Sequence, residues 1–306
     1  MRRLSGGKVL VRRQAVRKAY CRTIAQLAVK ALLYEVCIAP KPGLVDRYNN
    51  GSHRDMNLYT FLDSACALAG YFEDITAEGM RLHSLSPGQL LPHLQQVGLL
   101  AEQNMFAATQ GINTHKGIVF SMGIFCAACG YWYERSGPLS VAELLSLCGE
   151  IAGAPSRGEN SQPSTNGERL YHKYRIQGVR GEVAQGFPSV QRHGLPAFRH
   201  AMQCGWGMDA AGVYALLHIM ANLEDTNIIS RSNLITQEQL RRTLTEFLQQ
   251  PALSADKILE QAAQMDKEFI TQNISPGGAA DMLSITLLLW FLQTTWPERF
   301  GESGAL

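Results

Sequence analysis

The sequence predicts an all-α protein: a single compact domain of roughly ten helices, with the active site built from the loops between helices. Three observations predict this fold class. Apolar residues recur at three- and four-residue spacing, the alternation typical of strands hardly occurs, and polar breaks rich in glycine and proline separate the apolar stretches. With 306 residues, 46% of them hydrophobic, the chain is long enough to bury a large core.

The first half of the chain is expected to form five helices. The apolar spacing from Ile24 to Glu35 predicts the first, which ends before Pro40. The next four are expected over residues 61–72, 90–106, 117–133 and 141–152. Residues 117–133 are apolar nearly all round, which predicts a helix buried at the centre of the molecule. Ser140 suits the N-cap of the helix that follows.

The second half begins with a polar stretch, residues 155–168, that lacks periodicity and predicts a loop. Helices are expected beyond it over residues 168–174, 189–204, 209–223, 236–249, 254–272 and 278–295. The polar breaks on both sides of the loop share one chemistry, which favours a single domain over residues 19–296. We expect a basic, disordered tail over residues 1–18 and a second tail over residues 297–306.

Composition excludes several classes of protein. The formal net charge of +2 is too small for a general nucleic-acid surface. The longest apolar run, Met282–Leu292, is far shorter than the roughly 20 residues of a membrane helix. The basic N-terminus lacks the apolar segment of a secretory signal, and the seven cysteines lie mostly in apolar stretches, as reduced thiols do. Neither GxGxxG nor a Walker-type P-loop occurs. We therefore expect a soluble, cytoplasmic protein without nucleic-acid or membrane partners.

The first polar break runs from Pro40 to Met56. Two prolines flank Lys41 and a glycine follows, so a stiff loop presents this lysine. Asp55 is either a functional carboxylate or the N-cap of the next helix, and the sequence leaves both open.

Two further breaks stand directly before apolar helices, at Thr114–Gly117 and Ser275–Gly278. The N-terminus of a helix offers free N–H groups and the positive end of its dipole, so both starts suit a phosphate. The alternative for the first is that Thr114 caps the helix and His115 satisfies a neighbouring carbonyl. In the second, the serine suits the N-cap position, and Asp281 either complements the dipole or binds a metal or a ribose.

Carboxylates mark the remaining breaks. Asp225 follows the helix expected over residues 209–223, and an acidic residue at a helix C-terminus opposes the dipole. We expect a cation to compensate, which makes Asp225 a candidate Mg²⁺ ligand; solvent exposure is the alternative. The Arg180-Gly-Glu182 segment could supply a phosphate-binding guanidinium and a carboxylate base, or only a surface ion pair.

Together these segments resemble the triphosphoribosyl-dephospho-CoA synthase family, whose members serve citrate lyase and malonate decarboxylase. The resemblance covers about residues 20–295. It rests on Glu35 with Pro40–Arg47, Ser52–Met56, Gly111–Gly117, Asn160–Gln162, Gly178–Glu182, Asp225–Asn227 with Ser230–Arg231, and Asn273–Asp281. Asn160–Gln162 and Glu168–Tyr171 look more like the citrate-lyase branch. Two segments depart from the family pattern: its Ser-Arg-Gly-Gly reads Ser230-Arg-Ser-Asn233 here, and its Gly-Gly-Ser-Ala-Asp reads Gly277-Gly-Ala-Ala-Asp281.

The resemblance implies a pentosyltransferase. The ribose 2′-hydroxyl of 3′-dephospho-CoA would attack the anomeric carbon of ATP, and adenine would leave. The product, 2′-(5″-triphosphoribosyl)-3′-dephospho-CoA, would be the precursor of the prosthetic group of the citrate lyase acyl carrier protein, attached by a downstream phosphoribosyl-dephospho-CoA transferase. Mg²⁺ is expected beside the ATP triphosphate.

The roles expected of single residues follow from their side chains. The catalytic candidates are Glu182, Asp55 and His115, with Glu182 or Asp55 as the base. The substrate-binding candidates are Lys41, Arg47, Asn113, Lys116, Arg180, Asn227, Arg231, Gly277 and Gly278. The candidate Mg²⁺ ligands are Asp46, Asp225 and Asp281. The alternative functions are the same transfer serving malonate decarboxylase, an all-α Mg²⁺-dependent hydrolase of nucleotides or ADP-ribose, and a nucleotide-binding protein without activity.

Overall fold

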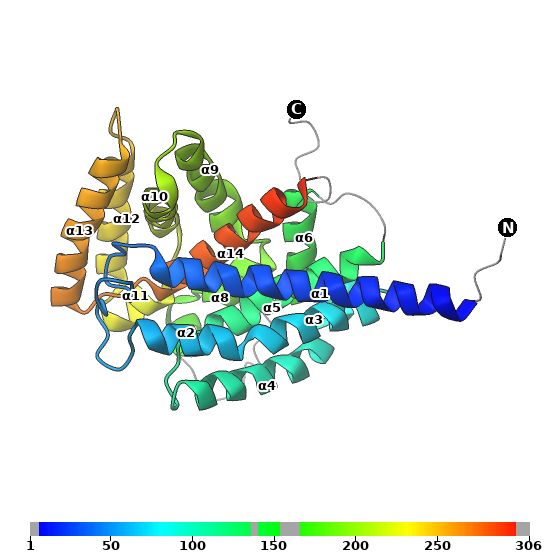
Figure 1. Ribbon diagram of the computed structural model, residues 1–306. Coiled ribbons are helices and arrows are strands. Elements are labelled where there is room, and N and C mark those ends of the chain that lie inside the picture. The colour runs from blue at the N-terminus through cyan, green and yellow to red at the C-terminus, as the bar shows by residue number, and fades with distance from the viewer. Residues whose placement is uncertain (1–5, 136–139, 154–165, 298–306) are drawn as a thin grey trace.

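The computed structural model describes residues 6–135, 140–153 and 166–297, and this part of the chain contains helices and no strand (Figure 1). The all-α prediction is therefore confirmed. The first half forms α1 (Gly6–Cys37), α2 (Leu58–Ala67), α3 (Ala69–Arg81), the short turn η1 (Pro87–Gln89), α4 (Leu91–Ala108), α5 (Lys116–Tyr133) and α6 (Val141–Ala152). The second half forms α7 (Asn166–Tyr174), α8 (Gly178–Ala184), η2 (Val190–Gly194), α9 (Leu195–Gln203), α10 (Gly207–Asn222), α11 (Thr226–Arg231), α12 (Leu234–Leu248), α13 (Ala255–Gln272) and α14 (Gly277–Thr295).

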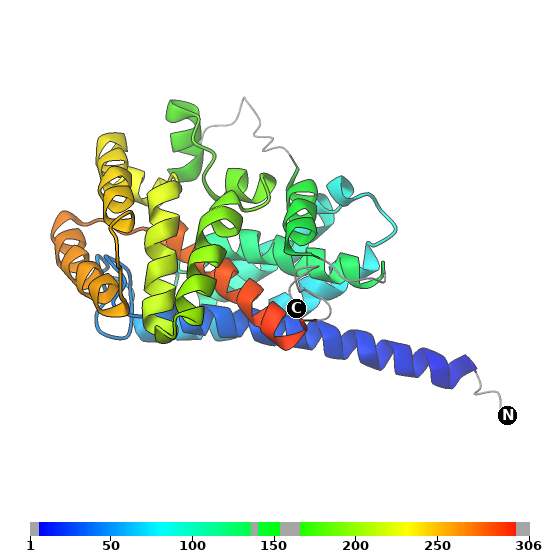
Figure 2. The same ribbon diagram turned by 90° about the horizontal axis from the view of Figure 1, so that it is seen from above.

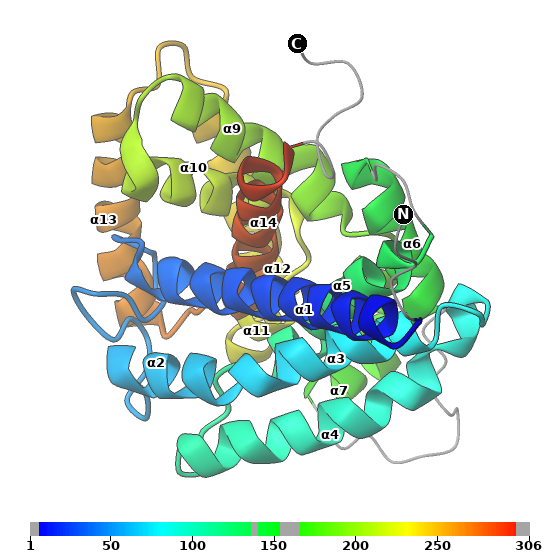
Figure 3. The ribbon, with the colours of Figure 1, turned by 45° about the vertical axis from the view of Figure 1, so that its right-hand side comes forward.

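The interior is built around α5, α10 and α14, whose side chains are buried nearly all round. Helix α1 spans the molecule, with α2, α3 and α4 on one side of it and α9, α10 and α14 on the other (Figure 3). Helix α3 packs closely on α5, because Gly79 lies against the carbonyl of Ala127 and Gly130 against that of Thr76, with no room for a Cβ at either glycine. One continuous apolar core joins helices from both halves of the chain, as expected of a single domain.

The N-terminus differs from the prediction of a tail over residues 1–18. Helix α1 begins at Gly6 and continues without a break to Cys37. No glycine or proline interrupts residues 8–37, so nothing in the sequence stops the helix. Arg13 and Arg17 also form ion pairs with Glu134 at the end of α5, with N–O distances of 3.2 and 2.8 Å. Figure 2 shows the first turns of α1 projecting beyond the other helices.

Several other elements also differ from the prediction. Two expected breaks form the short helices α8 and α11, the helix expected over residues 61–72 is divided at Leu68 into α2 and α3, and the first turn expected over residues 189–204 is the wider turn η2. Most of the predicted 155–168 loop and of the C-terminal tail lies outside the described residues. No described helix combines the length and the apolar character that crossing a membrane requires.

Candidate active site

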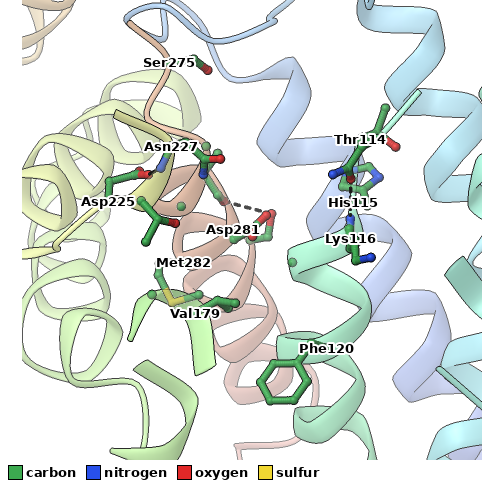
Figure 4. A pocket seen from close by; sticks show the side chains of 18 of the residues that line it. Thr114, His115, Lys116, Phe120, Val179, Asp225, Asn227, Ser275, Asp281 and Met282 are labelled. Carbon is green, nitrogen blue, oxygen red and sulfur yellow. Dashed lines mark hydrogen bonds between the residues drawn. The ribbon is translucent and has the colours of Figure 1, made fainter. Parts of the chain in front are cut away.

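A cavity of about 800 Å³ lies where α5, α8, α11 and α14 meet the loop between α1 and α2 (Figure 4). Helices α5 and α14 both begin at this cavity, the first with Lys116 and Gly117 and the second with Gly277 and Gly278. In the sequence, the residues that line the cavity range from Glu35 to Ser284. Segments far apart in the sequence therefore form one polar site, as the pattern of polar breaks predicted.

Most of the residues expected at the site line this cavity. They are Lys41, Asn113, His115, Lys116, Arg180, Glu182, Asp225, Asn227, Arg231, Gly277, Gly278 and Asp281.

Three expected residues do not line it. Asp46 is buried inside its own loop, where its carboxylate accepts the backbone N–H groups of Lys41, Tyr48 and Asn49 at 2.7 to 3.1 Å. Arg47 donates two hydrogen bonds of 2.7 Å to the carboxylate of Asp209 on α10. The Asp55 side chain is 64% exposed and lies outside the cavity lining. Asp46 therefore stabilises its own loop and Arg47 holds that loop on α10, while Asp55 lies outside the cavity lining.

Lys41 pairs with a residue that was not among the predicted site residues. Its side chain is 2% exposed, and Nζ forms an ion pair with Glu35 in the last turns of α1. Burial raises the pKa of the Glu35 carboxyl, while the charge of Lys41 opposes this shift. Lys41 was expected to bind phosphate, but its ammonium group already neutralises a buried carboxylate.

His115 is a buried, neutral imidazole at the start of α5. Burial, and then the positive charge of Lys41, lower its pKa to about 3. Its Nδ1 lies 2.7 Å from the hydroxyl oxygen of Ser64 on α2, which also accepts a hydrogen bond from Thr114. Thr114 therefore does not cap α5, and Asn113 accepts the N–H of Lys116 instead. At neutral pH His115 can take part in hydrogen bonds but cannot supply a positive charge.

Asp225 links α11 to α14. It was expected to end a helix, but it is the N-cap of α11, where a carboxylate is favourable. One oxygen accepts the N–H of Asn227 at 2.8 Å, and the other accepts the N–H of Ala279 in the first turn of α14 at 2.9 Å. Gly278 lies directly under this carboxylate, since a Cβ there would come within 3.0 Å of it. Burial nevertheless raises the pKa of Asp225.

Asp281 lies between the starts of α14 and α5 (Figure 4). On α5 it faces Gly117, where a Cβ would overlap the carboxylate oxygen Oδ2. Burial raises the pKa of Asp281 well above its ordinary value, and the nearby carboxylates of Asp225 and Glu35 raise it further. Asp225 and Glu35 are therefore close enough to Asp281 to disfavour its ionisation.

The charge of the cavity lining is nearly balanced. The lining side chains among the described residues include five Lys or Arg and six Asp or Glu, one of each being the pair Lys116–Glu102 at 3.1 Å. Such a lining carries too little positive charge to balance a polyphosphate by itself. A bound polyanion would need added cations, and the carboxylate oxygens around Asp281 could bind them. No group of three metal-ligating His, Cys, Asp or Glu side chains occurs in the described part of the chain.

Comparison with known proteins identifies the family. The model of the ATP:dephospho-CoA triphosphoribosyl transferase family matches residues 21–300. The chain belongs to this family. Three relatives each carry the name "Probable 2-(5''-triphosphoribosyl)-3'-dephosphocoenzyme-A synthase". The one from Vibrio cholerae is 35% identical over 91% of this chain and 90% of its own. Those from Streptococcus mutans and Streptococcus pyogenes are 36% and 37% identical, over 89% and 90% of this chain and 96% and 98% of theirs. No solved structure matches the chain.

The lining also contains polar residues that were not among the predicted site residues, including Glu35, His53, Glu102 and Ser275. Glu35 had a signal, because it occupies the apolar face of a periodic helix, where a charge needs a partner. Ser275 was expected as an N-cap, but it makes no capping hydrogen bond, and Pro276 takes the N-cap position of α14. Nothing in the sequence pattern places Glu102 on α4 beside the cavity.

Proposed function

We propose that the protein transfers the triphosphoribosyl group of ATP to the 2′-hydroxyl of 3′-dephospho-CoA and releases adenine. The observation that carries this proposal is the polar cavity described above, whose lining lies wholly within the residues matched by the family model. Its volume of about 800 Å³ is in the range of sites that enclose sizeable ligands. Carboxylates and cationic groups line it together, as cleavage of an N-glycosidic bond beside a triphosphate requires.

For Mg²⁺ we propose Asp281 and Asp225 as the protein ligands. The donor set fits, because Mg²⁺ takes oxygen ligands and commonly binds one or two carboxylates together with substrate phosphates. Burial is the main cause of the raised pKa of Asp281, and a cation would relieve the repulsion from Asp225 and Glu35 that adds to it. When bound, Mg²⁺ would neutralise charge on the triphosphate.

For the phosphates we propose Lys116 and Arg180. The Lys116 side chain is 43% exposed, and among the described residues its ion-pair partner is Glu102 at the cavity rim. The Arg180 guanidinium lies 5.4 Å from the ring centre of Phe120, on a wall that also offers an apolar surface. Lys41 is proposed to hold Glu35 in place instead of binding phosphate directly.

For the base that takes the proton of the attacking hydroxyl we propose Glu182. It lines the cavity, and the backbone N–H of Ser189 donates to its Oε1 at 2.7 Å, which fixes the carboxyl group. Burial raises the pKa of Glu182, which makes its carboxylate a stronger base than an exposed one. Such a base is worth about 10²–10⁴-fold in rate.

The test is incubation with ATP, Mg²⁺ and 3′-dephospho-CoA, followed by mass spectrometry of the CoA product. We expect a product heavier by one triphosphoribosyl group and the release of one adenine for each product formed. Reactions without Mg²⁺ or without 3′-dephospho-CoA are the controls. Adenine release that does not need 3′-dephospho-CoA would favour a hydrolase, and a CoA product of unchanged mass would refute the proposal.

We further propose that the product serves citrate lyase, and that the enzyme works in the cytoplasm. The first rests on the sequence at Asn160–Gln162, outside the described residues, and at Glu168–Tyr171. The second is supported by the seven cysteines, all of which are free thiols. Neighbouring genes for citrate lyase or for malonate decarboxylase subunits would distinguish the two pathways.

A further inference from the structure

Three side chains from distant segments form a hydrogen-bonded chain at the edge of the cavity. Arg231, at the end of α11, lies with Nη2 3.3 Å from Nδ1 of His53, in the loop between α1 and α2. His53 Nε2 lies 2.9 Å from the hydroxyl oxygen of Ser275. Ser275 stands on the segment that leads into α14 (Figure 4). All three residues line the cavity.

The direction of these hydrogen bonds follows from the chemistry of the groups. A guanidinium group can only donate, so Nδ1 of His53 must be the acceptor. A neutral imidazole whose Nδ1 accepts carries its hydrogen on Nε2, so His53 donates to the oxygen of Ser275. Burial, and then the charge of Arg231, lower the pKa of His53, while Asp55 opposes them only weakly from 3.8 Å. His53 is therefore neutral at pH 7, in agreement with this direction.

Because the Ser275 oxygen accepts a hydrogen bond from His53, its own hydroxyl hydrogen remains available for donation to a ligand in the cavity. The residue is 2% exposed, and among the described residues its oxygen forms no hydrogen bond except the one with His53. A buried hydroxyl hydrogen without an acceptor is costly, so an acceptor is expected when the cavity is filled.

The same geometry rules out a nucleophilic serine. Ser275, His53 and Asp55 superficially match a catalytic triad. In a triad the imidazole nitrogen facing the serine must be free to take its proton, but Nε2 of His53 already carries a hydrogen. Arg231 holds the position in which the triad carboxylate would bind Nδ1–H. The chain of groups donates toward the cavity and does not withdraw a proton from it.

We propose that Ser275 donates a hydrogen bond to a phosphate oxygen of the bound substrate at the start of α14, and that His53 and Arg231 act as positioning residues that keep Ser275 in its donor state. Each group in the chain polarises the next toward the ligand. Arg231 is itself fixed by the carbonyl of Ser52 and the side chain of Asn273, both at 3.1 Å. The identity of the substrate rests on the proposed function; the phosphate chemistry of this subsite does not.

The test is binding to the Ser275→Ala variant, measured by calorimetry with inorganic tripolyphosphate, ATP and 3′-dephospho-CoA in the presence of Mg²⁺. We expect tripolyphosphate to bind about 10- to 100-fold more weakly, as for the loss of one hydrogen bond to a charged group. Ser84→Ala, at an exposed serine, is the matched control and should bind like the wild type. Weaker binding of ATP alone would place the triphosphate at Ser275, and weaker binding of 3′-dephospho-CoA alone would place its pyrophosphate there. Unchanged binding of all three ligands would overturn the proposal.

Variants of His53 separate positioning from mere structural support. Glutamine can place an N–H donor near the position of Nε2, whereas leucine cannot. We expect His53→Gln to bind tripolyphosphate within about threefold of the wild type, and His53→Leu to lose as much as Ser275→Ala. Thermal unfolding of each variant shows whether it is folded. Equal losses in folded Gln and Leu variants would contradict the donor chain. Because tripolyphosphate binding needs no turnover, the subsite can be confirmed even if the transfer reaction is not observed.

Discussion

Replacing Lys41 by methionine should destabilise the protein far more than the same change at Lys116. Both lysines pair with a glutamate, but the side chains of Lys41 and Glu35 are 2% and 5% exposed, whereas those of Lys116 and Glu102 are 43% and 25% exposed. Removing one partner of a buried pair leaves a charge without compensation and costs about 3–5 kcal/mol. An exposed pair is worth about 1 kcal/mol or less.

The cost of Lys41→Met should depend on pH. Burial already raises the pKa of Glu35, and the loss of Lys41 removes the charge that opposes this shift. A carboxyl group whose pKa is higher in the folded than in the unfolded state binds more protons when folded, so its effect on stability is most favourable at low pH. The unfolding free energy of the variant, relative to the wild type, should fall as pH rises above the ordinary value of 4.5 for Glu35, by at most about 1.4 kcal/mol per pH unit.

Urea denaturation at pH 5 and pH 8 measures this directly. We expect Lys41→Met to be the least stable variant at pH 8, to recover part of its loss at pH 5, and to be rescued by the second change Glu35→Gln, which removes the unpaired charge. Lys116→Met should stay within about 1 kcal/mol of the wild type at both pH values. Equal losses for the two lysine variants, or no rescue by Glu35→Gln, would refute the buried-pair argument.

Three further predictions concern the acidic end of the cavity and His115. Gly117→Ala adds a methyl group that overlaps the Asp281 carboxylate, so adenine release should fall about 10²-fold, whereas Gly98→Ala, with nothing closer than 3.8 Å, should leave the rate unchanged. Asp281→Asn should weaken Mn²⁺ binding in the presence of ATP by about tenfold or more, measured by electron paramagnetic resonance; an unaltered Mn²⁺ titration would contradict its role as a ligand. With a pKa of about 3, His115 should not titrate between pH 5 and 8 by NMR. Because the unfolded chain binds this proton more readily than the folded protein, His115 should lower the unfolding free energy as pH falls below 6.5.

Except for α1, whose first turns were expected to be a tail, the sequence predicted the long helices well and the short ones poorly. The predicted bounds of α6 match the structure, and those of α5 and α14 differ by one residue, because each has an apolar face and a clear start. Helices α8 and α11 have only seven and six residues, too few for a periodicity to be recognised. Their formation depends on tertiary contacts, such as the packing of α11 on α12 and α14.

The site was predictable as a set of segments but not residue by residue. Lys41 and His53 reach the cavity from the loop between α1 and α2, whereas Asp46, Arg47 and Asp55 of the same loop do not. Residue type could not separate them, since all five are charged or titratable. The direction of each side chain depends on partners elsewhere in the fold, for example Asp209, which binds Arg47 from 162 positions away in the sequence.

The helix starts at the cavity have a different electrostatic role from the one that the sequence suggested. They were expected to bind phosphate through free N–H groups, but Asn113 accepts the N–H of Lys116, and Asp225 accepts the N–H of Ala279. The positive ends of both helices also face carboxylates, that of α5 through Gly117 beside Asp281 and that of α14 through Ala279 beside Asp225. Acidic groups stabilised in this way can share a cation with a polyphosphate. Because one N–H at each helix start already has an acceptor, side-chain donors around these starts become more important for the substrate phosphates, and the hydroxyl hydrogen of Ser275 is one of them.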